Sequence, residues 1–367
     1  MNVVDLLCQL VRRPTHHAAR AEEAGDELAL CHDVAPLLRA GGADEVVVEA
    51  CPRASGHPGG YVFARWGTPR TLINAHVDTV PANRGWSHDP WTPEVKDGRV
   101  SGLGSADTKG AIAAAIVALD RVRPRDVGLL FSGDEERGTA AVRAFLASPH
   151  AAAVERVVVC EPTARQAGVA HRGVLAYTAR VRGHGGHSSR ADFQPAPIVT
   201  MARLAIALHD LGVARKDAGP DGMRGLCMNV AGIDGGVAFN VIPEEAALTF
   251  SIRPAPGFDR AAWEATLAAT IAAIDPAIAL TCEIEHAPFG GGDDRGLAAL
   301  VRPHVEALVP LDFWTEAALY QAAGKAAIVV GPGDIGCAHA ADESVAIADL
   351  EWAVALCADV YAEAGRG

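Results

Sequence analysis

The apolar positions of the first 172 residues form short runs separated by segments with helical spacing, which is typical of an open sheet covered by helices. The runs that predict strands are Glu45–Val48, Tyr61–Arg65, Thr71–Ala75, Val127–Ser132 and Arg156–Cys160. Helical spacing between them predicts helices over Gly110–Val122, which is rich in alanine, and Thr139–Ala147. Near the N-terminus, an amphipathic helix is predicted with one face made by Val3, Leu6, Leu7 and Leu10.

The pattern changes between residues 174 and 286. Strands are predicted at Val174–Arg182, Leu226–Ile233, Ala247–Arg253 and Ala279–His286, and helices at Pro195–Leu211 and Phe258–Ile274. Their order along the chain is β-α-β-β-α-β, the ferredoxin-like split unit. We therefore predict an inserted domain at 174–286.

The earlier style of alternation resumes after this insert. A buried strand is predicted at Ala326–Val330, and a final helix from Asp349 to about Ala364. The first domain is therefore predicted to consist of residues 1–173 and 287–367. The fold class predicted for the whole chain is α/β, with helices flanking the central sheet of the first domain.

Polar residues follow several of the predicted strands directly. His76 follows TLINA, Glu135 and Glu136 follow LLFSGD, Glu161 follows RVVVC, and His339 lies in the loop after AIVVGPGD. Asp107 lies in the glycine-rich GLGSADTKG loop, just before a helix. Functional groups of open α/β sheets collect beyond the carboxyl ends of the strands. This set of imidazoles and carboxylates suits zinc or a similar divalent ion.

Each of these residues also has an ordinary interpretation. A single histidine after a strand usually packs or faces solvent, and a Glu-Glu pair is normally a solvated surface. The G-x-G of the loop lacks the third glycine and the downstream acid of a dinucleotide site. Only the combination of two histidines and several acids at strand ends favours a metal site.

Two spacings add detail to the predicted site. His76 and Asp78 point to the same face of an extended segment, so Asp78 could accept the second imidazole N–H; the alternative is an acid in a turn. Glu135 and Glu136 are adjacent, so one of them is expected to bind metal while the other acts as a general base toward water.

Composition excludes several classes of partner. The formal net charge is −13, from 45 acidic and 32 basic residues, which disfavours nucleic acids and anionic membranes. No run of 18 unbroken apolar residues predicts a membrane span, and the N-terminus lacks signal-peptide features. The eight cysteines form no C-x-x-C pair, so we expect reduced thiols in a cytoplasmic protein.

Eight sequence blocks resemble the zinc metallopeptidase and deacylase family that includes acetylornithine deacetylase, succinyl-diaminopimelate desuccinylase, aminoacylase and carboxypeptidase G. They are NAHVDTVP, GLGSADTKGAIAA, SGDEERGT, VVVCEPT, RGHGGHSS, FNVIPEEA, SIRP and GPGDIGCAHAADE, and they run from about residue 71 to 345. The sequences GLG and FWTEAALY and that of the last block are most similar to those of the acetylornithine and acetylcitrulline deacetylase branch. Leu103 departs from the family, which usually has arginine there.

The resemblance implies a two-zinc catalytic domain, in which cobalt can replace zinc. It implies that Asp107 bridges the metals, with His76 and Glu161 on one and Glu136 and His339 on the other. Glu135 would be the general base. Asp78, through its expected contact with His76, is counted with Glu135 and His187 among the catalytic residues.

The resemblance further implies that the inserted domain is a lid that forms a homodimer. His187 of this domain would reach across the dimer to stabilise the oxyanion. Asn240 and Arg253 would hold the α-carboxylate of the substrate. Glu316 is a candidate for the polarity of the substrate pocket, or simply an acid at the start of a helix.

The implied activity is hydrolysis of the N-acetyl amide of a small amino acid, N-acetylcitrulline or N-acetylornithine, in arginine biosynthesis. Alternatives on the same scaffold are a dipeptidase and a desuccinylase-like amidohydrolase. A non-catalytic metal-binding protein is a more remote alternative. A nucleotide-binding oxidoreductase, suggested by the glycine-rich loop, leaves the D-E-E and H-x-D motifs unexplained.

Overall fold

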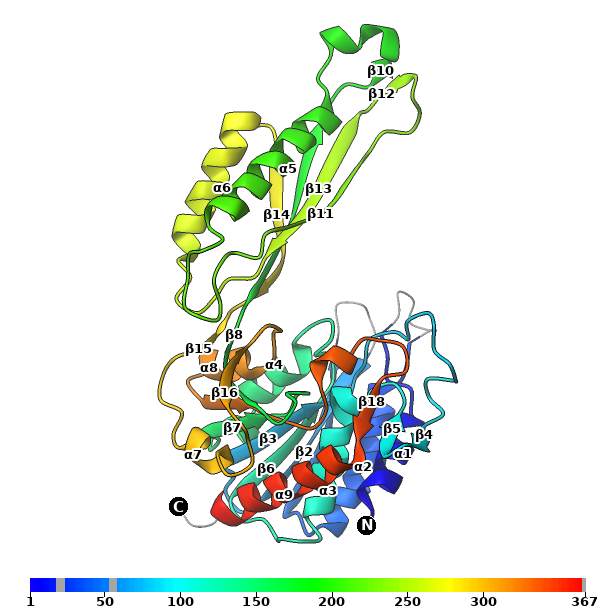
Figure 1. The fold of residues 1–367 in the computed structure, drawn as a ribbon, viewed down its shortest axis with the longest axis vertical. Coiled ribbons are helices and arrows are strands. Elements are labelled where there is room, and N and C mark those ends of the chain that lie inside the picture. Colours follow the sequence, from blue (N-terminus) through cyan, green and yellow to red (C-terminus); the bar gives the residue numbers. More distant parts are fainter. Residues whose placement is uncertain (18–23, 53–57, 365–367) are drawn as a thin grey trace. The chain divides into compact units, whose positions relative to one another are not determined.

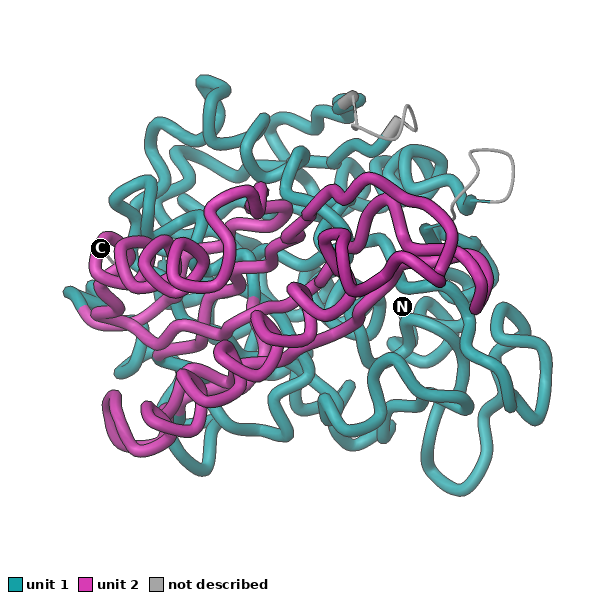
Figure 2. Tube along the Cα trace, turned by 90° about the horizontal axis from the view of Figure 1, so that it is seen from above, with its two compact units in different colours: residues 1–169, 292–309, 315–367 teal, residues 170–291, 310–314 magenta. Residues whose placement is uncertain are grey.

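The computed structural model describes residues 1–17, 24–52 and 58–364. The chain divides into two compact units (Figure 2). Unit 1 comprises Met1–Val169, Gly292–Val309 and Thr315–Gly367, and unit 2 comprises Ala170–Gly291 and Pro310–Trp314. The predicted domain limits lay at 173/174 and 286/287 and did not anticipate the short return of Pro310–Trp314 into unit 2.

The main sheet has nine strands in the order β1-β2-β6-β3-β7-β17-β8-β15, with β16 paired to β8. Its strands are β1 (Glu45–Pro52), β2 (Pro58–Trp66), β3 (Thr71–His76), β6 (Val127–Ser132), β7 (Arg156–Val159), β8 (Ala167–His171), β15 (Phe289–Gly290), β16 (Leu308–Leu311) and β17 (Ala326–Val329). β3 is parallel to β6 and β7, and β7 is parallel to β17, whereas β1–β2 and β2–β6 pair antiparallel. The predicted α/β fold with a mixed central sheet is confirmed.

Helices cover both faces of this sheet (Figure 1). Their bounds are α1 (Val3–Val11), α2 (Glu27–Ala40), α3 (Gly110–Ala118), α4 (Ala140–Ala147), α7 (Leu297–Val301), α8 (Ala317–Ala322) and α9 (Ile347–Ala364). Val62 and Ala64 of β2 pack with α1, α2, α3 and α9, whereas Phe63 points the other way and lies 5.2 Å, between ring centroids, from Phe145 of α4. Successive side chains of a strand point to opposite faces of the sheet, and helices cover both faces. The central strands β3 and β6 are therefore buried along their whole length.

Several predicted bounds are wrong. The helix predicted to run to Val122 ends at Ala118, and the strand predicted from Leu226 begins at Asn229. Helix α2, with Asp26 as its N-cap, was not predicted. The small sheet of β4 (Glu94–Lys96), β5 (Arg99–Ser101) and β18 (Ser344–Ala346) was not predicted either.

Unit 2 contains a four-stranded antiparallel sheet in the order β11-β13-β9-β14. The elements follow one another as β9 (Val174–Arg182), α5 (Pro197–Ala214), β11 (Asn229–Gly235), β13 (Glu245–Ile252), α6 (Arg260–Ile274) and β14 (Ala279–His286). Alternate residues of β13 are buried against the two helices. The predicted β-α-β-β-α-β order is therefore present.

A two-stranded ribbon, β10 (Gly186–His187) with β12 (Val241–Ile242), extends the β9–β13 pair. In the described chain, α5 is the one helix long and apolar enough to cross a membrane by length and composition. Met201, Leu204 and Leu208 of this helix pack into the core of unit 2, so one of its faces is already covered by protein.

Candidate metal centre

Candidate ligands lie just beyond the carboxyl ends of three parallel strands of the main sheet, β6, β3 and β7. His76 is the last residue of β3, and its cross-strand partner Ser132 is the last residue of β6. The turn that carries Glu135 and Glu136 follows Ser132 directly, and Glu161 lies two residues beyond β7. Because β6, β3 and β7 are neighbours that run in the same direction, their carboxyl ends meet at the same edge.

Asp107 is held by the segment that precedes α3. The side chain of Glu343 accepts hydrogen bonds from three backbone N–H groups of this segment, those of Gly104 (3.0 Å), Ala106 (2.9 Å) and Asp107 (3.0 Å). The hydroxyl of Thr108 donates to the carbonyl oxygen of His76 at 2.8 Å. These contacts fix the Asp107 segment both to the end of β3 and to the loop that carries His339.

The structure brings all five predicted ligands together. His76 Nε2 lies 3.0 Å from Asp107 Oδ1 and 3.9 Å from Glu161 Oε2. His339 Nε2 lies 3.3 Å from Asp107 Oδ2 and 2.9 Å from Glu136 Oε1. The Asp107 carboxylate therefore lies between the two imidazoles, one on each of its oxygens.

Burial and mutual repulsion perturb these groups strongly. Burial, together with the neighbouring carboxylates, raises the pKa of both Glu135 and Glu161 well above the ordinary value. Hydrogen bonds from His339 and His76 outweigh burial at Asp107 and hold the pKa of that carboxyl below its usual range. The hydrogen bond to Asp107 is the largest of the causes that raise the pKa of His339 to about 10.

Such a concentration of buried acids needs positive charge to compensate it. Two imidazole nitrogens and three carboxylates are ligands that zinc and related divalent ions accept, and the central Asp107 offers one oxygen to each side. The side chains of this cluster therefore fit a pair of divalent ions.

Asp78 organises the neighbourhood of His76 differently from the prediction. Its backbone oxygen, at 2.9 Å, contacts His76 Nδ1, whereas the nearest carboxylate oxygen lies 3.7 Å away. The carboxylate instead accepts the backbone N–H groups of Glu135 (3.1 Å) and Glu136 (3.0 Å). The reason is that β3 ends at His76, so strand alternation does not extend to Asp78.

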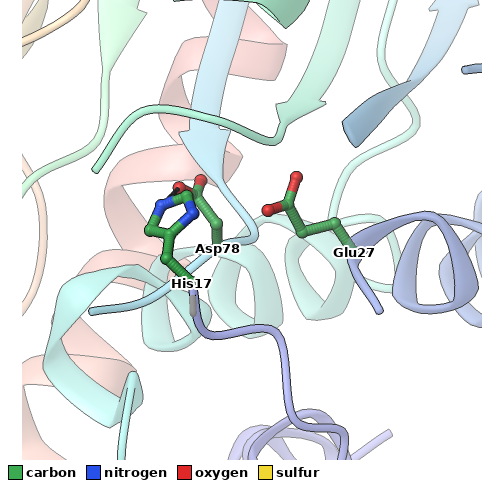
Figure 3. Close-up of side chains that lie close together, drawn as sticks. All are labelled: His17, Glu27 and Asp78. Atoms are coloured by element: carbon green, nitrogen blue, oxygen red, sulfur yellow. Dashed lines mark hydrogen bonds and ion pairs between the residues drawn. The ribbon is translucent and has the colours of Figure 1, made fainter. Parts of the chain in front are cut away.

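Sequence reasoning missed two buried residues beside the site. His17 Nε2 lies 2.9 Å from Asp78 Oδ2, and Glu27 approaches the same carboxylate (Figure 3). His17 lies in a segment without strand or helix spacing, so no sequence signal connected it to Asp78. Glu343 was part of a quoted block, and the signal that could have found it is an acid four residues after the ligand His339.

Glu316 does not line an open pocket, because it is only 1% exposed. Ser132 Oγ donates to its carboxyl at 2.8 Å, and burial raises its pKa to about 7. It stands at the N-cap of α8, but its side chain makes no hydrogen bond to that helix. Leu103, at the position where the family usually has arginine, is also buried.

The three candidates in unit 2 are exposed, and they do not gather at one place. His187 pairs with Val241 in the β10–β12 ribbon, and the backbone N–H of Ser188 donates to the carbonyl oxygen of Asn240, so His187 and Asn240 are close. Arg253 follows the opposite end of β13. The eight residues of this strand span about 25 Å. One copy of unit 2 therefore does not bring Asn240 and Arg253 together, and their predicted shared contact with a substrate carboxylate stays a prediction.

Comparison with known proteins gives a consistent result. The family model described as Peptidase family M20/M25/M40 matches residues 72–363. N-acetyl-L-citrulline deacetylase of Xanthomonas campestris pv. campestris is 39% identical over 303 residues, which cover 79% of this chain and 81% of that protein. Acetylornithine deacetylase of Proteus mirabilis is 30% identical, covering 95% and 93%. Succinyl-diaminopimelate desuccinylase of Stenotrophomonas maltophilia is 28% identical, covering 95% of each.

Solved structures show the same fold. An M20 family metallo-carboxypeptidase from Sulfolobus solfataricus superposes with a TM-score of 0.75 at 15% identity, covering 98% of both chains. Human carnosine dipeptidase 1 gives a TM-score of 0.74 at 17% identity, covering 100% of this chain and 97% of that one.

Proposed function

The chain belongs to peptidase family M20/M25/M40 and is an amidohydrolase, and we propose that it removes the N-acetyl group of a small amino acid, N-acetylcitrulline or N-acetylornithine. The observation that carries the substrate class is the 39% identity to an N-acetyl-L-citrulline deacetylase over four-fifths of that protein. N-acetylcitrulline is accordingly the first substrate to test. The proposed role is in arginine biosynthesis. All eight cysteines lie in described parts of the chain and are free, which fits a reducing cytoplasm.

We propose that the cluster holds two zinc ions, for which cobalt can substitute. His76, Glu161 and one oxygen of Asp107 would hold the first ion, and His339, Glu136 and the other oxygen of Asp107 the second. When bound, zinc ions supply Lewis-acid polarisation of the scissile carbonyl and lower the pKa of water.

Glu135 is the proposed general base. It lies beside the ligands without being needed as one, and its backbone N–H is anchored by Asp78. Burial raises the pKa of Glu135 well above the ordinary value, so this carboxylate accepts a proton more readily than an exposed one, as a general base requires. It would take a proton from the attacking water and pass it to the departing amine nitrogen. Acetate and the free amino acid are then the products.

We propose that the enzyme is a homodimer formed through unit 2. Apolar side chains on one stripe of α5 are exposed, and they include Ile206 (63%) and Val213 (52%). The adjacent β11 is an edge strand of its sheet and exposes Ile233. A second copy placed against α5 and β11 would cover both features.

Dimerisation would also explain how Asn240 and Arg253, which lie far apart in one chain, can contact the same substrate. If His187 and Asn240 come from one chain and Arg253 from the other, the length of β13 no longer prevents them from meeting one substrate. Arg253 is then the proposed partner of the substrate carboxylate, a task that suits the planar guanidinium. His187 would stabilise the oxyanion of the tetrahedral intermediate.

Acetate and amine release from a panel of substrates tests this function. The panel comprises N-acetylcitrulline, N-acetylornithine, N-succinyl-diaminopimelate and a dipeptide. We expect the highest kcat/KM with an N-acetyl amino acid. Turnover of the dipeptide or the succinyl substrate with inert acetylated substrates would refute the proposal and favour the dipeptidase or the desuccinylase alternative. A chain that binds two metals and turns over none of the panel would favour the non-catalytic one.

A further inference from the structure

We propose that His17 is a positioning residue of this enzyme, which fixes the Asp78 carboxylate and, through it, the turn that presents Glu135 and Glu136. The inference deepens the proposed function and rests on it for its activity readout. His17 belongs to none of the sequence blocks that carry the family resemblance.

Asp78 is the hub of this arrangement. The residue is fully buried, and both its backbone oxygen and its carboxylate make contacts. Its backbone oxygen contacts the imidazole of His76, and its two carboxylate oxygens accept the backbone N–H groups of Glu135 and Glu136. The orientation of this carboxylate therefore sets the place of a proposed ligand, Glu136, and of the proposed base, Glu135.

His17 supplies the third hydrogen bond to that carboxylate. Its Nε2 lies 2.9 Å from Asp78 Oδ2, the oxygen that also accepts from Glu136. A carboxylate can only accept at this position, so Nε2 is the donor. The imidazole is 7% exposed, and water does not easily replace its contact.

The backbone holds His17 in place from the same side. The N–H of His17 donates to the carbonyl oxygen of Thr79 at 3.1 Å, and the N–H of Thr79 donates to the carbonyl oxygen of Thr15 at 3.2 Å. The segments around His17 and Asp78 therefore form one hydrogen-bonded unit. A side chain on such a support positions its partner with little freedom, as functional sites require.

The carboxylate of Glu27 lies near that of Asp78, so the hydrogen bond from His17 is needed to hold Asp78 in place. The candidate ligand atoms of His17, Glu27 and Asp78 lie within 4.8 Å of one another, and Figure 3 shows the imidazole against the Asp78 carboxylate. Glu27 also packs closely against Gly133, just before the turn that carries Glu135 and Glu136. A Cβ added at Gly133 would lie only 1.9 Å from Glu27 Oε2. Two carboxylates this close repel each other, and the N–H of His17 stabilises the arrangement.

A third metal ion is the competing explanation for this cluster. It is disfavoured because the Asp78 carboxylate already accepts from two backbone N–H groups and from His17, which uses three of its about four lone-pair positions. The two explanations predict different metal stoichiometries.

The test compares His17→Leu with His17→Gln and His17→Asn. Glutamine can place an N–H near the position of Nε2, whereas asparagine is too short to do so. For the leucine and asparagine variants we expect kcat to fall about 10- to 100-fold while KM stays within about threefold. The glutamine variant should recover most of kcat. His16→Gln is the matched control, since His16 packs on Trp91 at 5.0 Å between ring centroids.

Two measurements separate positioning from general damage. The visible absorption of the cobalt-loaded enzyme should change in the leucine and asparagine variants and return toward the wild-type spectrum in the glutamine variant. Metal analysis should give two ions per chain in the wild type and in all variants. If the leucine variant does not fold, the glutamine and asparagine variants decide the question.

Three results would overturn the proposal: wild-type kcat and spectrum in the leucine or asparagine variant, equal impairment of the glutamine and asparagine variants, or a third ion in the wild type that the variants lose. If the wild type released no acetate from any acetylated amino acid, the proposed function would fail. The cobalt spectra and metal stoichiometry would still decide the role of His17.

Discussion

The residues assigned to chemistry fall into two regions of opposite character. In unit 1 the candidate metal centre is assembled from strand ends, and most of its side chains are buried and connected by hydrogen bonds. In unit 2, His187, Asn240 and Arg253 are exposed, and they lie at two separate places. One chain therefore brings the buried set together by itself, whereas it does not bring the exposed set together, and we propose that a second chain does so.

The largest expected effect is in the buried half. Glu135→Gln should lower kcat by about 10³- to 10⁴-fold, because the amide cannot take a proton from water. Metal analysis should still find two ions, since Glu135 is not among the proposed ligands. Glu155→Gln, which alters an exposed acid paired with Arg70, is the control. Substantial turnover by the Glu135 variant would assign the proton transfer to another group.

The next effect probes the exposed half. His187→Ala should lower kcat by about 10²- to 10³-fold through loss of oxyanion stabilisation. His184→Ala, a change in the same exposed segment, should leave kcat within about twofold. Steady-state kinetics on the metal-loaded variants gives both values. Equal kcat in the two variants would remove His187 from the site and weaken the contrast between the regions.

The third prediction concerns Glu316, a buried acid of unit 1 that should make the free energy of unfolding depend on pH. Its pKa is about 7 when folded and 4.5 ordinarily, so the unfolded chain binds fewer protons between those pH values. The contribution of Glu316 to the free energy of unfolding therefore decreases as pH rises from about 4.5 to about 7. Glu316→Gln should remove up to about 3 kcal/mol of this pH dependence.

Urea unfolding of the wild type and the Glu316 variant at pH 5 and pH 8 provides this measurement. The difference in free energy between variant and wild type should move in favour of glutamine at the higher pH. Glu306→Gln, an exposed substitution, should show no such shift. A pH-independent difference for Glu316→Gln would mean that this carboxyl is not protonated in the folded enzyme near neutral pH.

Glu343 should have the smallest effect of the four. Its carboxylate accepts three backbone N–H groups of the Asp107 segment, and glutamine cannot satisfy all of them. We expect Glu343→Gln to weaken metal binding by about 10- to 100-fold, measured by competition with a chelator. Asp342→Asn changes the adjacent acid, which contacts Ser87 instead, and should leave metal affinity unchanged.

Much of the buried half could be predicted because its residues follow local patterns. His76, Glu135 and Glu161 come directly after apolar runs, and neighbouring parallel strands bring their ends together. The residue-by-residue roles came from resemblance to a family. The element most clearly missed, α2, contains Pro36, which interrupts the expected helical pattern.

The supporting contacts could not be predicted, because they join distant parts of the chain. His17 and Asp78 are 61 positions apart, and Glu343 and Gly104 are 239 apart. No periodicity encodes such pairs, and a single acid or histidine in a loop is usually a surface residue. The error at Asp78 came from extending strand alternation by two residues beyond the end of β3.

The central claim is that buried ligands of one chain and exposed groups of another form one active site. Mixing Glu135→Gln with His187→Ala subunits tests it directly, because an exchanged dimer would contain one site with both Glu135 and His187. Each parent alone should keep at most about 1% of wild-type activity. Random exchange should restore about a quarter of wild-type acetate release. Dimers that exchange subunits, as verified by mass, yet remain inactive would contradict a site shared between two chains.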